Sequence, residues 1–310
     1  MLVEDLYVVM KVAEFRNITA AAASLDISPA TASATLKRVE KSLGFELFTR
    51  TTRQLRLSSA GERYLPQCEQ ALRLLEQAKS HLKQDLAIID GELRIALSSD
   101  LGRNLVVPWL DTFMETHPNV SVRINISDSN VDFYRDSVDM ALRYGSPNDA
   151  NTHGFKICDV PLVLCASKGY LDQHGTPQHP DDLAHHNGLF YQRYGIPFDR
   201  WPLFKGKDTY KITMKGNRTS NDGDLVRRWC VAGKGIALKS ALDIAPDLLA
   251  GNVISLLPDI DKTQTELWLL FSSRQAITPA ARLLRDSLKE KAQSILQKLA
   301  NKGLENKIST

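Results

Sequence analysis

Residues 28–44 read SPATASATLKRVEKSLG, and this stretch decides how the N-terminal part of the chain folds. Ser28 suits the N-cap of a helix, Pro29 suits its first turn, and Gly44 suits the left-handed residue that ends it. Apolar residues three and four positions apart predict a buried stripe, formed by Leu36, Val39 and Leu43. Outside this stripe we expect Thr31, Ser33, Thr35 and Lys37. Ser and Thr are mediocre helix formers, so we expect the hydroxyls to face a partner outside the helix.

Two further helices are expected before this one. Residues 4–14 place apolar side chains at helical spacing, and Asn17 can cap an alanine-rich helix over residues 20–25. A three-residue turn, 26–28, then leads into the third helix. This order is typical of a helix-turn-helix, in which the first residues of the last helix meet base edges in the DNA major groove. Hydroxyl groups can donate or accept hydrogen bonds at those edges.

The residues after Gly44 predict a wing. Residues 54–57 alternate in polarity, which indicates a two-stranded ribbon whose tip, residues 50–53, can reach the DNA backbone or minor groove. A capping box of Ser59 and Glu62 then opens the next helix. Basic residues outnumber acidic ones over residues 34–63, as in a nucleic-acid footprint. The predicted DNA-binding residues are Ser28, Pro29, Thr31, Ser33, Thr35, Lys37, Arg38, Arg50 and Arg53. A solvated basic turn remains the alternative for the two wing arginines.

Residues 18–62 resemble the winged helix-turn-helix of LysR-type transcriptional regulators. The matching features are the alanine-rich second helix, Ser28 and Ser33, Leu43-Gly44, Leu47-Phe48-x-Arg50, and Ser58-x-Ala60-Gly61. One departure is Ala34, where many members of the family carry arginine. A base or phosphate contact that the resemblance implies is therefore missing, and sequence preference would depend more on Ser33, Thr35, Lys37 and Arg38.

A seven-residue repeat over residues 65–90 predicts a coiled-coil linker that joins two chains. The residues on its seam are Leu65, Cys68, Leu72, Leu75, Lys79, Leu82, Leu86 and Ile89. A homodimer would present two recognition helices and read an inverted-repeat operator in double-stranded DNA. The resemblance further implies a homotetramer, with RNA polymerase as an additional candidate partner. An amphipathic helix packed on its own domain is the alternative.

From residue 91 onward, strands and helices alternate, which predicts an α/β fold with helices on both faces of a parallel sheet. The expected elements include strands over residues 92–97 and 120–126 and helices over residues 101–115 and 131–137. We interpret two doubly wound lobes. Lobe I comprises residues 91–162 and 265–300, lobe II comprises residues 163–264, and residues 301–310 form a tail. The DNA-binding domain is then residues 1–64.

Ligands of such folds bind between the lobes, at the carboxyl ends of the strands. Ser98, Ser99, Ser127 and Asp128 lie at such ends, and Asn221 opens a helix of the second lobe. The resemblance implies a domain like a periplasmic binding protein. On that basis the predicted effector-binding residues are Ser98, Ser99, Ser127, Arg143 and Asn221. Capping roles for Ser98 and Ser127 remain open.

Helix N-termini and an arginine both suit an anion, which favours a small carboxylate-bearing effector. Arg143 is the residue expected to pair with that carboxylate, and a structural ion pair is the alternative for it. Asp128 or Asp222 at the same place would weaken the preference, because each would repel an anion.

The composition excludes several classes of protein. The chain has 310 residues, 43% of them hydrophobic and 24% charged, which is typical of a soluble globular protein. No apolar run reaches the roughly 18 residues of a membrane span, and Glu4 and Asp5 lie where a signal peptide would be basic. We therefore predict a cytoplasmic protein. The four cysteines are widely spaced, which favours reduced thiols and leaves a redox switch as the minor alternative.

No catalytic motif, metal-ligand spacing or nucleotide fingerprint occurs in the sequence. The histidines in residues 174–186 lack helical spacing and a thiolate partner, so a surface loop is the interpretation. We therefore predict no enzyme, no cofactor and no metal. The hypothesis is a DNA-binding regulator that responds to a small molecule. A solute-binding protein is opposed by the basic wing, and an architectural DNA protein would need no effector site.

Overall fold

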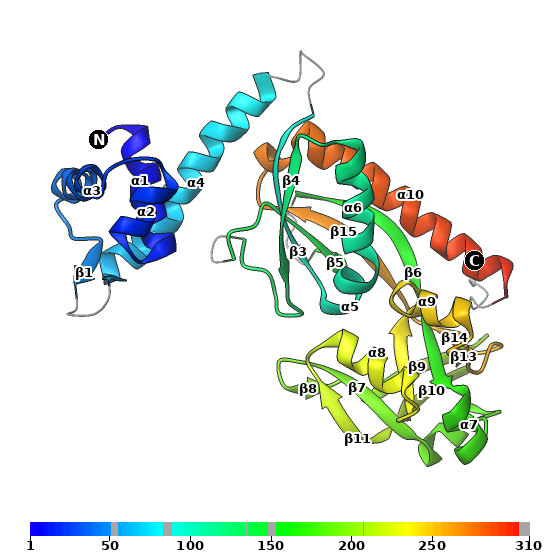
Figure 1. Ribbon diagram of the computed structural model, residues 1–310. Helices are drawn as coiled ribbons and strands as arrows, with labels where there is room; N and C mark the ends of the chain where they lie inside the picture. The colour runs from blue at the N-terminus through cyan, green and yellow to red at the C-terminus, as the bar shows by residue number, and fades with distance from the viewer. Residues whose placement is uncertain (51–54, 83–88, 134–135, 148–152, 207, 304–310) are drawn as a thin grey trace. The chain divides into compact units, whose positions relative to one another are not determined.

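The structure is a computed structural model that describes residues 1–50, 55–82, 89–133, 136–147, 153–206 and 208–303. The chain forms two compact units (Figure 1). The N-terminal unit comprises Met1–Ile88 with Asp132–Ser137, and the C-terminal unit comprises Ile89–Val131 with Val138–Thr310. Each unit is described by itself below.

The N-terminal unit is a winged helix-turn-helix. Its elements are α1 (Val3–Phe15), α2 (Ile18–Ser24), α3 (Pro29–Leu43), β1 (Phe48–Arg50), β2 (Leu55–Leu57) and α4 (Ser59–Leu82). The Asn17 side chain caps α2 by accepting a hydrogen bond from the amide of Ala20 at 3.1 Å. Gly44 ends α3 with a φ of 76°, in the left-handed region that glycine adopts without strain. Strands β1 and β2 pair antiparallel.

The wing is attached to the helices by specific contacts. The Glu40 carboxylate of α3 accepts hydrogen bonds from the amides of Leu47 and Phe48, at 2.8 and 3.2 Å. Gly61 in α4 lies so close to Leu47 that an added Cβ would be 2.2 Å from its carbonyl oxygen. Only glycine fits there, and the wing therefore lies at a fixed place beside α3.

The C-terminal unit is built on one mixed sheet with the strand order β11-β7-β12-β6-β15-β5-β3-β4. The strands are β3 (Gly91–Leu97), β4 (Val120–Ile126), β5 (Met140–Tyr144), β6 (His153–Ser167), β7 (Asn187–Arg193), β11 (Lys215–Ser220), β12 (Ile236–Ser240) and β15 (Gln264–Phe271). Two short strands, β8 (Ile196–Pro197) and β13 (Val253–Ser255), pair with β7 and β6. A second sheet contains β9 (Arg200–Lys205), β10 (Asp208–Thr213) and β14 (Asp261–Lys262).

Strand β6 changes partners along its length, and this change separates two lobes. Its first part pairs antiparallel with β15 as far as Pro161, and its next part pairs with β12 from Leu162. Within lobe I, β3 pairs parallel with β4 and β5; within lobe II, β7 pairs parallel with β11 and β12. Each lobe therefore has a parallel core, and β6 and β15 add antiparallel pairs that make the sheet mixed. The predicted α/β fold class is confirmed, but the sheet is not parallel throughout.

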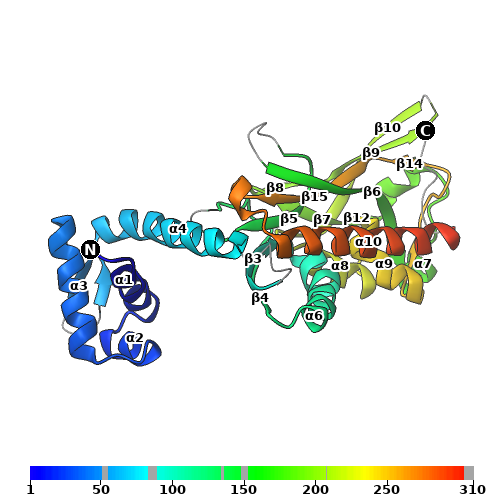
Figure 2. The ribbon, with the colours of Figure 1, turned by 90° about the horizontal axis from the view of Figure 1, so that it is seen from above.

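Helices cover the sheet. They are α5 (Ser99–Leu101), the π-helix η2 (Gly102–Val106), α6 (Val107–Thr116), α7 (Lys168–His174), the 3-10 helix η3 (Pro180–His185), α8 (Gly223–Val231), α9 (Ala241–Ala250), the 3-10 helix η4 (Arg274–Ala276) and α10 (Pro279–Asn301). Helix α10 runs lengthwise beside β6 and contacts α9 (Figure 2). No helix among the described residues combines the length and apolarity that crossing a membrane requires.

The helix expected over residues 131–137 is wrong. Where that segment is described, its backbone forms turns, and Ser137 has a φ of 52°. The Asp136 side chain accepts a hydrogen bond from the Asp132 amide at 3.0 Å. Asp and Ser side chains compete with the helical hydrogen bonds in this way, and the apolar spacing did not reveal it.

Candidate nucleic-acid interface and effector site

The start of α3 carries its hydroxyls on the surface. The Ser28 hydroxyl accepts a hydrogen bond from the Thr31 amide at 3.1 Å and lies 2.9 Å from the Thr31 hydroxyl. Both side chains are exposed, as is Pro29. These hydroxyls therefore cap the helix and still have hydrogen-bonding capacity toward solvent.

The exposed side of α3 continues from this cap. Ala30, Ala34, Lys37 and Lys41 are all exposed and repeat at four, three and four residues, so they lie on one helical face. Ser33 lies beside this face and is half-buried. Lys41 is absent from the predicted site, although the same spacing would have revealed it.

Two predicted contact residues are engaged inside the domain. Thr35 is only 4% exposed, so the expectation that it lies outside the buried stripe is wrong. Ala32, Leu36 and Val39 are buried at positions that share its helical face. Arg38 binds the buried carboxylate of Asp5 through two guanidinium nitrogens, one of which also donates to the Thr35 hydroxyl at 3.3 Å.

The ion pair between Asp5 and Arg38 is strongly held. The hydrogen bonds from Arg38 lower the pKa of Asp5 despite its burial, and the amide of Leu2 adds a further hydrogen bond. The Arg38 side chain nevertheless remains 54% exposed. Arg38 can therefore contact a DNA phosphate only while it keeps its ion pair with Asp5.

The tip of the wing, with Arg53, lies outside the described residues, and so does the side chain of Arg50. Strand β2 carries Arg56, which is exposed and faces Thr49 across the ribbon. The structure therefore describes the backbone of both wing strands, β1 and β2, on either side of the tip.

The linker helix α4 is partly buried in its own domain. Leu65 joins the core of the N-terminal unit, and Cys68 and Leu72 are also buried. Leu75 is 45% exposed. The side chains of Lys79 and Leu82, and all of Leu86, lie outside the described part of the chain. Ile89 is not helical and packs against the core of the C-terminal unit, so it does not extend the seam of α4.

A carboxylate occupies the junction of the two lobes. Asp128 follows β4 of lobe I, and its oxygens accept hydrogen bonds from the Ser99 amide at 2.7 Å and the Ser99 hydroxyl at 2.5 Å. The amide of Gly223, the first residue of α8 in lobe II, donates to the same carboxylate at 2.7 Å. Ser99 in turn accepts a hydrogen bond from the Asp224 amide at 3.2 Å. Ser99, a predicted effector contact, is thus bound to the protein itself.

The other predicted effector residues surround this junction without converging on one point. The Ser98 hydroxyl is buried and has no hydrogen-bond partner among the described residues. The Ser127 hydroxyl accepts from the Ser129 amide at 3.1 Å, and the Ser127 carbonyl accepts from Arg143. Asn221 is exposed. Sequence reasoning placed Ser98 and Ser127 at the ends of strands and Asn221 at the start of a helix, but it did not predict how Asp128 engages Ser99.

Further polar contacts join the lobes. Arg103 of lobe I lies 3.0 Å from Asp222, and Asn104 donates to Asp224 at 2.9 Å. Arg193 of lobe II donates to Asn130 at 2.5 Å. The two lobes are therefore bridged along several points by the chain's own side chains.

Beneath these contacts lies a buried charge cluster that the sequence did not reveal. The Lys239 ammonium is 2.5 Å from Asp100, 3.8 Å from Asp243 and 2.9 Å from the Gly223 carbonyl oxygen. Burial raises the pKa of Asp100 to about 7, although Lys239 opposes this shift. Burial also raises the pKa of Asp243. Tyr144 of lobe I donates to Asp243 at 2.7 Å.

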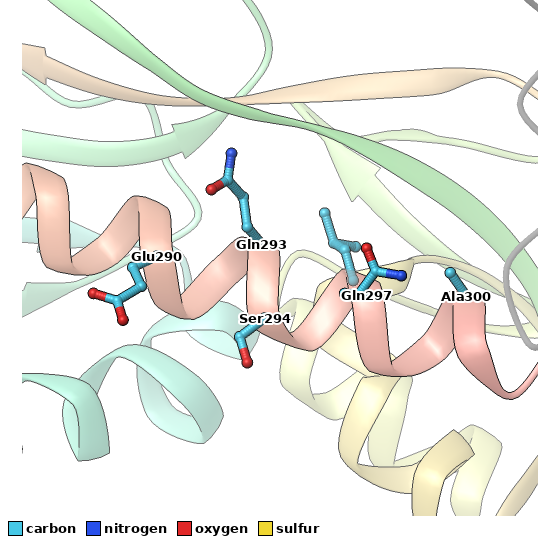
Figure 3. Close-up of a pocket in the computed structure, with 6 residues that line it drawn as sticks. Glu290, Gln293, Ser294, Gln297 and Ala300 are labelled. Atoms are coloured by element: carbon cyan, nitrogen blue, oxygen red, sulfur yellow. The ribbon is translucent and has the colours of Figure 1, made fainter.

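A shallow depression of about 560 Å³ runs along one side of α10 (Figure 3). It is lined by Glu290, Gln293, Ser294, Leu296, Gln297 and Ala300. All six residues come from one helix, and none belongs to the predicted effector site. The depression is open rather than enclosed, so its shape gives no reason to place an effector there.

The buried cysteines Cys165 and Cys230 lie outside both sites described above. The sulfur atoms of Cys165 and Cys230 are 3.8 Å apart and buried as free thiols, and their mutual contact together with burial raises the pKa of Cys165 well above its usual value. Within the described ranges, no cluster of His, Cys, Asp and Glu has the arrangement of a metal site.

This geometry is that of a DNA-binding regulator, and the chain belongs to the LysR family. Residues 3–62 match the bacterial regulatory helix-turn-helix of the lysR family, and residues 89–293 match the LysR substrate binding domain. The proteins of this family are transcriptional regulators and not enzymes, which confirms the predicted class.

Relatives match along most of their length. The chain is 30% identical over 289 residues to the HTH-type transcriptional regulator DmlR of Escherichia coli K12, covering 93% of this chain and 94% of DmlR. The full-length structure of AphB, a virulence activator of Vibrio cholerae, is 26% identical, with a TM-score of 0.56, covering 93% and 98%. CbnR, solved in complex with its target DNA, is 17% identical with a TM-score of 0.59, covering 94% and 100%, and shows the fold alone.

Proposed function

We propose that the exposed face of α3 reads base pairs in the major groove of an operator. The observation that carries this proposal is the surface at the start of α3, where Ser28, Thr31 and Lys37 are exposed and Ser33 lies beside them. Hydroxyls there can meet base edges, and Lys37 can meet phosphate or guanine. Thr35 is left out of this surface because it is buried.

Ser33→Ala tests base readout. The expected result is a changed sequence preference, with a loss of roughly 1–3 kcal/mol on the preferred duplex and little change on random DNA. Selection from a random duplex library, followed by equilibrium binding, measures both. Ser42→Ala is the matched control, because Ser42 is exposed on α3 nine residues on and so on the opposite side. An equal loss on every sequence would assign Ser33 to the backbone instead.

The wing is proposed to bind DNA backbone. We expect Arg53→Ala to weaken binding to all duplexes alike and to reduce the slope of log affinity against log salt by about one unit. A titration of one duplex at several salt concentrations measures this slope. An unchanged slope would make the wing arginine a solvated surface residue.

We propose that α4 joins two chains into a dimer that reads an inverted repeat. The exposed Leu74 and Leu75, at 43% and 45%, support this proposal, because exposed leucines on a long helix suit a partner helix. A homotetramer, and RNA polymerase as a partner of the DNA-bound assembly, follow from the family as further proposals. Sedimentation of the wild type and of Leu75→Glu tests the first step, and a mixture with smaller species is expected for the variant.

The effector is proposed to bind where the lobes meet, near the carboxyl ends of β3, β4 and β5. Arg143, on β5, is the cation that would bind a carboxylate of the effector. Asp128 and Asp222 both lie at this junction and repel an anion, so the preference for a carboxylate rests on Arg143 and is weaker than the sequence suggested. Calorimetry against a panel of metabolites, followed by DNA binding with and without each ligand, tests this function. An architectural protein would bind DNA and ignore every metabolite. A response with an unchanged midpoint in Arg143→Ala would remove Arg143 from the site.

A further inference from the structure

The carboxylate of Asp128 has the surroundings of a bound ligand. Three donors, two from Ser99 and one from Gly223, are directed at its two oxygens at 2.5–2.7 Å. The donors belong to different lobes, because Ser99 precedes η2 in lobe I and Gly223 begins α8 in lobe II. A single carboxylate therefore links the lobes, as a bound effector would.

The backbone that carries Asp128 is also held from both lobes. Tyr191 of lobe II donates to the Asp128 carbonyl oxygen at 3.4 Å, and Arg143 of lobe I donates to the carbonyl oxygen of the preceding Ser127. The carboxylate is thus presented by a fixed backbone and is not a mobile surface group. This geometry lowers the entropic cost of its binding, in the way that tethering favours any ligand.

Charged groups of both signs lie around the carboxylate, and Arg103 is a cation close enough to interact with it. Asp222 and Asp224 lie at the same end of α8, and both engage Arg103. The Asp128 charge also contributes to the raised pKa of Tyr191, after burial. The three aimed donors therefore give this carboxylate specific hydrogen bonds that a charge-balanced neighbourhood alone would not supply, in the geometry that suits one small planar anion.

We propose that Asp128 is a built-in carboxylate that fills an anion subsite between the lobes and determines specificity by excluding small free carboxylates from it. This inference rests on the proposed effector site and narrows it. A carboxylate-bearing effector would engage Arg143, while the position at Ser99 and Gly223 stays occupied by the chain. Removing the Asp128 side chain creates a subsite that a free carboxylate can enter.

Chemical rescue by formate tests the proposal on the full chain. Asp128→Ala is expected to melt at a lower temperature than the wild type, and formate, at constant ionic strength held with chloride, is expected to restore it. The rescue should saturate with a dissociation constant of about 1 mM or weaker, because a ligand of three heavy atoms gains little binding energy. Calorimetric titration with formate gives the stoichiometry, which is expected to be one per chain.

Two controls separate specific rescue from a general salt effect. Asp128→Asn keeps the shape of the side chain and fills the subsite, so it should ignore formate, as should the wild type. Asp208→Ala, which removes an exposed carboxylate on β10, should also be unaffected. A second substitution, Ser99→Ala in the Asp128→Ala background, should weaken the rescue several-fold, because it removes the hydroxyl donor and leaves only the two backbone amides of residues 99 and 223.

Each outcome decides the proposal. Formate-dependent stabilisation confined to Asp128→Ala supports it, and equal stabilisation of the wild type overturns it. If Asp128→Ala does not fold, Asp128→Ser is titrated in the same way, and absence of rescue in both variants overturns the proposal. The experiment uses neither DNA nor the natural effector. A regulator that fails to respond to metabolites therefore refutes the proposed effector site and leaves the formate result standing.

Discussion

Two helix starts in this chain carry the same kind of side chain and have opposite surroundings. Ser28 and Thr31 at the start of α3 bond to each other and remain exposed. Ser99, at the start of α5, is 2% exposed and bonds to Asp128. The Ser28 hydroxyl thus caps its own helix, whereas the Ser99 hydroxyl is used in a contact between the two lobes. Whether such a hydroxyl can also contact a partner molecule depends on whether an acidic side chain from elsewhere in the chain already binds it, as Asp128 binds Ser99.

The lobe junction around Ser99 lies over a buried charge cluster, and removing a charge from this cluster is expected to have the largest effect on the free energy of unfolding. Lys239→Ala leaves Asp100 and Asp243 without the ammonium that faces both. Loss of one partner of a buried pair costs about 3–5 kcal/mol of unfolding free energy. Urea unfolding followed by tryptophan fluorescence measures this cost in the C-terminal unit, which contains all four tryptophans. Lys234→Ala, at an exposed lysine nearby, is the control.

The outcome of that experiment bears directly on the comparison. If Lys239→Ala costs no more than the exposed control, the junction at Ser99 is as loosely held as the start of α3. The distinction between a buried and an exposed helix start would then have no energetic basis. A large cost confirms that the lobes are fixed around Ser99 by charges beneath it.

The next prediction concerns pH. Because burial raises the pKa of Asp100 to about 7 from an ordinary value of 3.8, the folded protein binds a proton there that the unfolded chain releases. This group therefore reduces stability as pH rises from about 4 to about 7, by up to about 1.4 kcal/mol per pH unit, and has no further effect above. Asp100→Asn should remove that fall. Urea unfolding from pH 5 to pH 8 compares the two curves.

Parallel curves for the wild type and Asp100→Asn would contradict this prediction. Asp208→Asn is the matched control, because Asp208 is exposed and should leave the pH dependence unchanged. Asp243 keeps its own raised pKa in the variant, so part of the slope is expected to remain. The comparison of slopes, and not the absolute stability, is the informative quantity.

Asp5 in the N-terminal unit, like Asp128 at the lobe junction, is a carboxylate that accepts hydrogen bonds from two separate segments of the chain. Asp5→Ala removes the carboxylate that holds Arg38 and accepts from the Leu2 amide, at an expected cost of about 1–3 kcal/mol. Because the pKa of Asp5 is lowered, this contribution is present above about pH 4 and is lost as pH falls further. Hydrogen exchange of amides in α1 and α3 measures it.

The control for Asp5 is Glu4→Ala, which removes an exposed acid from the same helical turn. Equal exchange rates in the two variants would show that the ion pair of Asp5 and Arg38 contributes nothing. Faster exchange in Asp5→Ala alone confirms that a predicted DNA contact is first a structural residue.

These contacts show what the sequence could and could not predict. The caps Ser28, Pro29 and Gly44 act locally, and α3 has the bounds that they predict. The fold class followed from alternating patterns and is confirmed. The pairs of Asp5 with Arg38 and of Asp128 with Ser99 are 33 and 29 residues apart. No periodic pattern links such residues, because tertiary packing brings them together. The sequence therefore identified hydroxyl and basic residues correctly by type, without revealing which were already engaged.

The smallest expected effect lies at the exposed edge of the same junction. Arg103 and Asp222 form an ion pair at 3.0 Å, with side chains 42% and 36% exposed. Solvent screens such a pair, so Arg103→Ala should cost at most about 1 kcal/mol and less at high salt. Tryptophan-monitored urea unfolding at low and high salt measures this cost, with Arg282→Ala on α10 as an exposed control. A cost as large as that of Lys239→Ala would mean that the edge holds the lobes together as strongly as the buried cluster. Burial would then not explain why Ser99 is engaged by the protein while Ser28 is left exposed.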